Sequence, residues 1–172
     1  MKLDTRDATD LDVTRPEVED HAASFELFYR SERDGLFADL SLMTRDRHEA
    51  EELMHDAFLK VWERWGRVRH MDRPAGYLHR TALNAFRTRY RRAAIAKRMR
   101  GSTSKGDPLE DVEGRDRVDR ALAALTVRQR TAVILTDLLD YTSVEAGRVL
   151  GVRPGTVRVL AHRGHDALRK AM

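Results

Sequence analysis

Apolar residues recur along this chain at the spacing of α-helices, beginning near residue 24. The strongest pattern covers Arg47 to Trp65, where the apolar residues form one wide stripe and Gly66 is a natural stop. That stripe consists of Leu53, Met54, Ala57, Phe58, Val61, Trp62 and Trp65. Strand-like runs rich in Val, Ile, Thr and Tyr are missing, so the pattern predicts an all-α protein.

A break in the helical pattern divides the chain. A second strong helix is expected from about Ala75, and it continues into a run of arginines. Residues 101–108 then read Gly-Ser-Thr-Ser-Lys-Gly-Asp-Pro, a composition typical of linkers. The sequence therefore predicts two small helical domains, residues 24–95 and 117–172, joined by a flexible linker over 96–116. Residues 1–23 are acidic and aperiodic, and they predict a flexible tail.

Two capping boxes mark helix starts in the second half. Thr126 is followed three residues later by Gln129, and Thr142 by Glu145. In such a box the two side chains reciprocally bind backbone N–H groups that have no partner within the helix. A short helix is expected before the first box, with its apolar positions at Val118, Leu122 and Leu125.

The second capping box opens a helix-turn-helix pattern. This motif needs a small residue where its two helices touch and a glycine at the turn; Gly147 and Gly151 meet these needs. Pro154 suits the first turn of the next helix, where its missing N–H would have no partner. Cations and a hydroxyl on that helix could reach base edges and phosphates of DNA. Its expected outward positions are Arg153, Thr156, Arg158, Val159, His162 and Arg163.

Charge is distributed unevenly along the chain. The formal net charge is +4, yet Asn84 to Arg100 carries seven basic residues and no acidic one. Such a one-sided basic stretch indicates a polyanionic partner. A basic run by itself can equally be a solvated helix face.

Several classes of function find no support in the composition. The chain has no cysteine, which excludes disulfides and thiolate zinc sites and fits a cytoplasmic protein. Neither a signal peptide nor the roughly 18 consecutive apolar residues of a membrane span is present. The spaced histidines lack a carboxylate cluster that would complete a metal site, and no catalytic motif appears. We therefore expect a protein that is not an enzyme, with no metal, no cofactor and no membrane partner.

Two well-separated segments resemble one family. Residues 50–58, Ala-Glu-Glu-Leu-Met-His-Asp-Ala-Phe, resemble the region 2 signature of the extracytoplasmic-function (ECF) sigma factors of the sigma-70 family. Residues 74–78, followed by Asn84 and Arg91-Arg92, are similar to the continuation of that signature. Residues 151–158, Gly-Val-Arg-Pro-Gly-Thr-Val-Arg, resemble the region 4 helix-turn-helix. The resemblance implies a subunit that binds core RNA polymerase and directs promoter-specific transcription initiation.

The resemblance also implies which residues meet which partner. The polymerase-binding positions, expected to face the clamp helices of the largest subunit, are Glu49, Glu52, His55 and Asp56. The positions for melting and reading the minus-10 promoter element are Arg69, Asn84, Arg87, Arg91 and Arg92. The outward residues of the recognition helix named above would read the minus-35 element, beside the flap of the second-largest subunit. Whether an anti-sigma factor also binds stays open at this point.

The chain departs from its relatives within the recognition helix. Val159-Leu160 stands where relatives usually carry Ser-Arg, and Gly164 stands where alanine is common. We therefore expect a more apolar contact with the minus-35 element than is usual.

Several of these features also have an ordinary structural interpretation. The acidic edge formed by Glu49, Glu52 and Asp56 can be an ordinary solvated face. Tyr77 can be a core residue, and Asn84 can bond within its own helix. The alternative function is a stand-alone helix-turn-helix regulator whose first lobe is sensory. That alternative explains the second half equally well, but it leaves the acidic edge and the basic helix unexplained.

Overall fold

All regular secondary structure in the described residues, 15–100 and 116–171 of a computed structural model, is helical. The first lobe contains α1 (Arg15–Thr44), α2 (Arg47–Trp62), α3 (Trp65–Val68) and α4 (Pro74–Arg100). The second lobe contains α5 (Asp116–Ala123), α6 (Val127–Val133), the π-helix η1 (Ile134–Leu138), α7 (Ser143–Leu150) and α8 (Pro154–Ala171). The predicted all-α class is confirmed. The central part of the expected linker, residues 101–115, lies outside the described residues.

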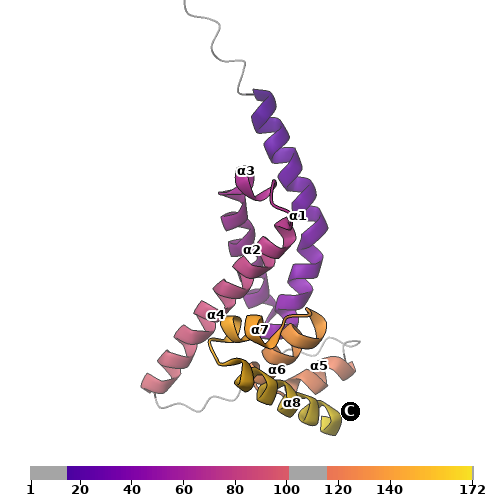
Figure 1. The fold of residues 1–172 in the computed structure, drawn as a ribbon, viewed down its shortest axis with the longest axis vertical. Helices are drawn as coiled ribbons and strands as arrows, with labels where there is room; N and C mark the ends of the chain where they lie inside the picture. Colours follow the sequence, from indigo (N-terminus) through magenta and orange to yellow (C-terminus); the bar gives the residue numbers. More distant parts are fainter. Residues whose placement is uncertain (1–14, 101–115, 172) are drawn as a thin grey trace, which may run out of the picture.

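In the first lobe α1, α2 and α4 pack as a bundle, with α3 at one end (Figure 1). Leucine, methionine and valine side chains fill its centre, as the apolar stripes predict. The most deeply buried are Leu36, Leu40, Met43, Leu53, Val61, Val68 and Leu78. Near α3 an aromatic cluster joins α1 to α2. Its members include Phe25, Phe28, Phe58, Trp62 and Trp65.

The tail prediction is wrong for residues 15–23, because α1 already begins at Arg15. Apolar residues show no helical period there, but tertiary contacts hold this end of the helix. Asp20 accepts a hydrogen bond from Arg69 at 3.0 Å, and the His21 ring lies edge-on to Trp62 with centroids 5.1 Å apart. Residues 1–14 lie outside the described residues.

The predicted stop at Gly66 is also wrong. Helix α2 ends at Trp62, with Glu63 as its C-cap, and Gly66 lies inside the short helix α3. The apolar stripe continues past the end of α2 because Trp65 starts a new helix whose side chains point into the same core, where Trp65 and Val68 are buried. Periodicity alone could not reveal this change of direction.

The second lobe follows its predicted pattern closely. Both capping boxes form, at Thr126 with Gln129 and at Thr142 with Glu145. Gly151 ends α7 in the left-handed conformation, φ 67°, which glycine adopts without strain. Helices α6, α7 and α8 form a compact unit beneath the lower end of α1, and α7 lies against α4 (Figure 1). The two lobes thus share one hydrophobic core cluster.

Gly147 is a position where the turn of the helix-turn-helix leaves no room for a larger side chain. A Cβ added there would lie 2.8 Å from the backbone oxygen of Val152, which cannot move without distorting the turn. We expect Gly147→Ala to destabilise the second lobe by about 1–3 kcal/mol despite the higher helix propensity of alanine. The measurement is chemical denaturation of the full chain followed by circular dichroism.

Gly155→Ala is the matched control. Gly155 is exposed in the first turn of α8, and a Cβ there meets only the end of the Arg158 side chain, at 3.8 Å. Alanine at this position should leave the stability unchanged or raise it slightly. Equal stability of the two variants would show that α7 and α8 do not touch at Gly147.

Candidate nucleic-acid interface

The acidic edge of α2 is partly engaged within the lobe. Glu52 accepts a hydrogen bond from Arg89 of α4 and lies 3.3 Å from His48. Glu49 is half-buried, and its burial raises the pKa of its carboxyl, with the nearby Arg89 acting in the opposite direction. His55 and Asp56 are exposed. Of the four predicted polymerase-binding residues, these two are therefore the most available to a partner.

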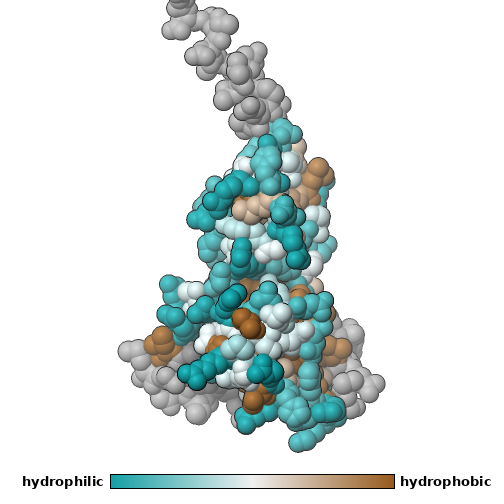
Figure 2. Space-filling view, in the orientation of Figure 1, coloured by the Kyte–Doolittle hydropathy of each residue, from teal (hydrophilic) through white to brown (hydrophobic). Residues whose placement is uncertain are grey.

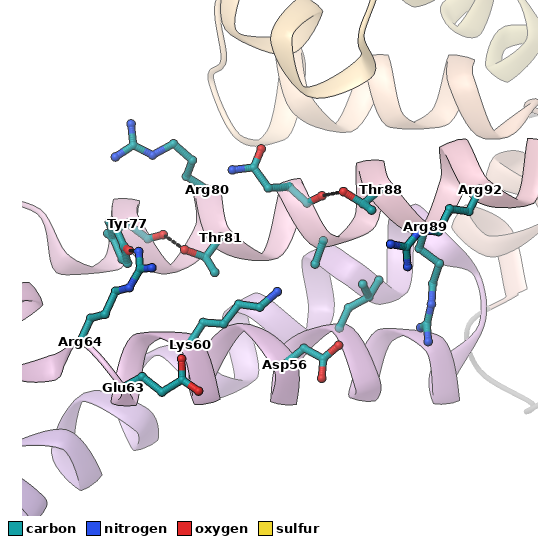
Figure 3. A pocket seen from close by; sticks show the side chains of 13 residues that line it. Asp56, Lys60, Glu63, Arg64, Tyr77, Arg80, Thr81, Thr88, Arg89 and Arg92 are labelled. Atoms are coloured by element: carbon teal, nitrogen blue, oxygen red, sulfur yellow. Dashed lines mark hydrogen bonds between the residues drawn. The ribbon is translucent and has the colours of Figure 1, made fainter.

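A polar groove runs between α2 and α4. Asp56, Lys60 and Glu63 line its α2 side, and residues from Tyr77 to Arg92 line its α4 side (Figure 3). At one end Arg64 donates a hydrogen bond to the Tyr77 hydroxyl at 3.1 Å. This bond raises the pKa of Arg64. The half-buried Tyr77 packs against the hydrophobic core and also lines the groove. Two acidic side chains, Asp56 and Glu63, and five basic ones line the groove, and its α4 side carries only basic charges, so the groove favours an anionic ligand.

Helix α4 presents the basic face that the sequence predicts. Asn84, Arg91 and Arg92 are exposed, and Arg87 is half-buried. Within residues 15–100 and 116–171, none of these three arginines forms an ion pair with a carboxylate, so their charges are available to an anionic ligand. Figure 3 shows Arg80 projecting from α4 away from α2.

Arg69 does not join this group. It follows α3, at the end of the first lobe that lies far from the second lobe (Figure 1), and it is paired with Asp20. The structure therefore brings together Asn84, Arg87, Arg91 and Arg92 on one helix but leaves Arg69 in a separate place.

Helix α8 exposes every outward residue that the sequence predicts. Arg153 lies in the turn just before the helix; Thr156, Arg158, Val159, His162 and Arg163 lie on it, and all are exposed. Val159 is 49% exposed, an unusual position for a valine on a free helix face. His162 lies 3.6 Å from Asp166 of the next turn. The face combines cations with one apolar residue, which suits a DNA groove carrying both phosphates and thymine methyl groups.

The unusual Gly164 has a packing explanation. It is buried where α8 crosses α6, and a Cβ at this position would lie 2.6 Å from a methyl carbon of Val133. At the next position along α8, His165 is hydrogen-bonded to Asp137 of η1. These contacts set the rotation of α8 about its own axis, and therefore which of its residues face outward.

The sequence did not indicate where several arginines lie or what they contact. Arg73, Arg80 and Arg148 line a second groove, between α4 and α7, together with Asn84 and Arg87. Arg130 is buried between the lobes. The signal for Arg148 was available, because it lies one turn before Gly151 in the same motif. Nothing local could reveal the others, since their surroundings come from distant segments.

Other kinds of site find no support in the described part of the chain. No group of three or more His, Asp or Glu side chains there could hold a metal ion. None of its helices is long and apolar enough to cross a membrane. Figure 2 shows a largely hydrophilic face with hydrophobic residues in small separate groups.

Comparison with known proteins identifies both lobes. Residues 28–96 match the family model of sigma-70 region 2, and residues 115–168 match that of sigma-70 region 4. The chain therefore belongs to the sigma-70 family, and its relatives place it among the ECF sigma factors.

The relatives match over most of their length. The ECF sigma factor SigM of Mycobacterium tuberculosis strain Erdman is 31% identical over 87% of this chain and 77% of its own length. The sigma factor CarQ of Myxococcus xanthus is 32% identical over 77% of this chain and 80% of its own. The fold is similar to that of the sigma factor RpoE of Bartonella quintana, solved in complex with the anti-sigma factor NepR. That similarity has a TM-score of 0.63 at 19% identity and covers 86% of this chain and 96% of the other.

Proposed function

We propose that this chain binds core RNA polymerase and directs it to promoters, with region 2 reading the minus-10 element and region 4 the minus-35 element. The observation that carries the proposal is that both regions are present in order, each with a basic helix whose cations are exposed. Polymerase supplies the chemistry, so the chain needs no catalytic residue. It would act in the cytoplasm, where polymerase transcribes.

The polymerase-binding surface is proposed to centre on Asp56 and His55. A carboxylate on a helix surface can form a directional pair with a guanidinium, and the clamp helices of the largest subunit would supply it. Glu49 and Glu52 would contribute less to this contact, because Glu49 is half-buried and Glu52 is hydrogen-bonded to Arg89. Region 4 would lie beside the flap of the second-largest subunit.

Recognition of the minus-10 element is assigned to α4. Melted DNA exposes two separated backbones and unstacked bases, so a protein that holds it needs cations along a groove. Arg87, Arg91 and Arg92 would bind phosphates, and the exposed Asn84 would contact a base or the backbone. Arg69 is paired with Asp20 at the other end of the lobe, so it would bind the promoter at a place separate from the α4 contacts.

Recognition of the minus-35 element is assigned to α8. The N-terminal part of a recognition helix enters the major groove, which places Arg153, Thr156 and Arg158 nearest the base edges. Val159 adds an apolar contact suited to a thymine methyl group. Arg163 lies more than a turn further along, where phosphates are closer than bases.

Two arginine variants test the assignment on α8. Arg158→Ala is expected to change which minus-35 sequences are used, at a cost of roughly 1–3 kcal/mol if the side chain makes a bidentate base contact. Arg163→Ala is expected to weaken binding about equally on all promoters and to reduce the salt slope by about one. The measurement is transcription of a promoter library by polymerase carrying each variant. Equal, sequence-independent losses for both variants would refute the assignment of Arg158 as the reading residue.

The stand-alone regulator is a weaker alternative, because the relatives that match this chain over most of its length are sigma factors. A gel-shift assay on duplex promoter DNA separates the two functions. A regulator binds such DNA tightly by itself, whereas the proposal predicts tight binding only in the presence of core polymerase.

Because the Bartonella sigma factor RpoE was solved with the anti-sigma factor NepR, we also propose that an anti-sigma factor regulates this chain.

A further inference from the structure

The recognition helix α8 packs against the rest of region 4 through small residues. Its buried positions are Val157, Ala161 and Gly164, which share one face of the helix. A Cβ on Gly164 would lie 2.6 Å from a methyl carbon of Val133 and 3.5 Å from the backbone oxygen of Gln129, so α8 approaches α6 as closely as a glycine allows. Small side chains bring two helices close together but form shallow ridges. They therefore resist rotation of α8 about its own axis less than large side chains would.

A polar pair at the edge of this face restrains the rotation. His165 Nε2 is hydrogen-bonded to Asp137 Oδ2 of η1, 28 residues away in the sequence. An ionised carboxylate only accepts hydrogen bonds, so the imidazole nitrogen is the donor. The other carboxylate oxygen, Asp137 Oδ1, lies 2.8 Å from the Thr136 hydroxyl, which holds the carboxylate in place. The pair thus joins one edge of α8 to a fixed point on η1.

Asp137 lies in a rare type of backbone. In η1 the N–H of Leu139 bonds to the oxygen of Ile134, five residues back, at 3.0 Å. Such π-helical turns are uncommon and occur often at functional sites. Among the helices of residues 15–100 and 116–171, η1 is the one with this hydrogen-bond pattern. The side chain that η1 contributes to α8 is that of Asp137.

The edge held by the Asp137–His165 pair is the edge that presents Arg158. His165 follows Arg158 by close to two full helical turns, so the two side chains lie along the same edge of α8. With an outer radius of about 5–6 Å, a rotation of about 20° moves the end of a side chain by about 2 Å. A bidentate contact with a base does not tolerate such a shift, because hydrogen bonds have a narrow range of length and angle. A contact with a phosphate, such as that assigned to Arg163, is less demanding.

The pair is better suited to orienting α8 than to stabilising the fold. The side chains of His165 and Asp137 are 42% and 45% exposed. Pairs of polar groups with this exposure contribute little to stability, because water competes for both partners. Loss of the pair should therefore change recognition more than folding.

We propose that Asp137 and His165 are positioning residues for minus-35 recognition. Their hydrogen bond, together with the close packing at Gly164, sets the rotation of α8 at which Arg158 reads a base. In this role the two residues act through Arg158 and need no contact of their own with DNA. The inference rests on the proposed function of α8.

The hydrogen bond can be observed in the free chain by nuclear magnetic resonance of the histidine rings. Asp137→Ala should move the ring signals of His165, whereas those of His48, an exposed residue of α2, should stay in place. The midpoint of thermal unfolding should change by less than about 3 °C, as expected for the loss of an exposed pair. Unmoved His165 signals would overturn the proposal, whatever the result of transcription.

Minus-35 preference is the functional readout, measured by transcription of a promoter library with core polymerase. His165→Ala and Asp137→Ala should each reduce the preference at the base read by Arg158 by at least about three-fold. The salt dependence of promoter binding should stay the same, because no phosphate contact is lost. In a chain that already carries Arg158→Ala, His165→Ala should cause no further loss of preference. A further loss of the same size would show that His165 contacts DNA itself, and would overturn the positioning role.

Two more variants separate positioning from a general disturbance of α8. His165→Gln keeps an N–H donor at a similar reach and should keep most of the preference. Arg169→Ala removes a pair with Asp166 that lies within α8, and it should leave the preference unchanged. If His165→Gln loses as much as His165→Ala, or if Arg169→Ala also loses preference, the proposal is wrong. Absence of any promoter-specific transcript from the unchanged chain would instead overturn the proposed function, while the ring signals would still report the hydrogen bond.

Discussion

Asp56→Arg is expected to weaken binding to core polymerase by at least about tenfold while the first lobe stays folded. Removing one partner of a desolvated ion pair at an interface costs roughly 2–5 kcal/mol, and each 1.4 kcal/mol is about a factor of ten in affinity. Asp56 is exposed and lies off the apolar core, so the fold should not depend on it. The measurement is the affinity of labelled chain for purified core enzyme.

Asp34→Arg is the matched control for that variant. It makes the same change of net charge at an exposed site on α1. Glu52 is less suitable for charge reversal, because the change would break its hydrogen bond with Arg89 within the lobe. If Asp56→Arg binds core as tightly as Asp34→Arg does, the edge of α2 is only a solvated face.

The second large effect is expected at the end of α4. Replacing Arg91 and Arg92 together with alanine should reduce promoter-specific transcription by at least about tenfold, because two phosphate contacts would be lost. The salt dependence of binding to a pre-melted promoter should fall by about 1.4 units of slope, at roughly 0.7 for each phosphate on single strands. Run-off transcription and binding to mismatched bubble DNA over a series of salt concentrations measure both effects.

The control for this variant removes two arginines from α1. Arg30 and Arg33 are exposed and paired with acidic neighbours, so replacing both by alanine changes the net charge equally. Transcription by this control should be close to that of the unchanged chain. A similar loss in both variants would mean that net charge, and not the position on α4, determines activity.

Local features were predictable from the sequence because their causes are local. The capping boxes and the glycine turn each depend on residues a few positions apart, and all formed as expected. The exposed face of α8 followed from helical spacing once its start at Pro154 was known. The two sigma regions were recognisable because their motifs keep order and spacing across the break.

Features that depend on distant segments were not predictable. The pair of Glu52 with Arg89 joins residues 37 positions apart, and it changes which carboxylate of the acidic edge is available. The helical residues 15–23 are held by contacts with Arg69 and Trp62, which no local pattern reveals. The burial of Arg130 depends on the docking of one lobe against the other. In each case a polar residue acquired its role through tertiary packing.

A reconstitution with core polymerase shows whether this chain gives the enzyme its promoter specificity. Purified chain and core enzyme would be combined on the DNA upstream of the chain's own gene, and the start site of the run-off transcript mapped. We expect a single start that appears only when both components are present and that is lost with the Arg91 and Arg92 double variant. Tight binding of the chain alone to duplex DNA, with no transcript above that of core enzyme, would contradict it.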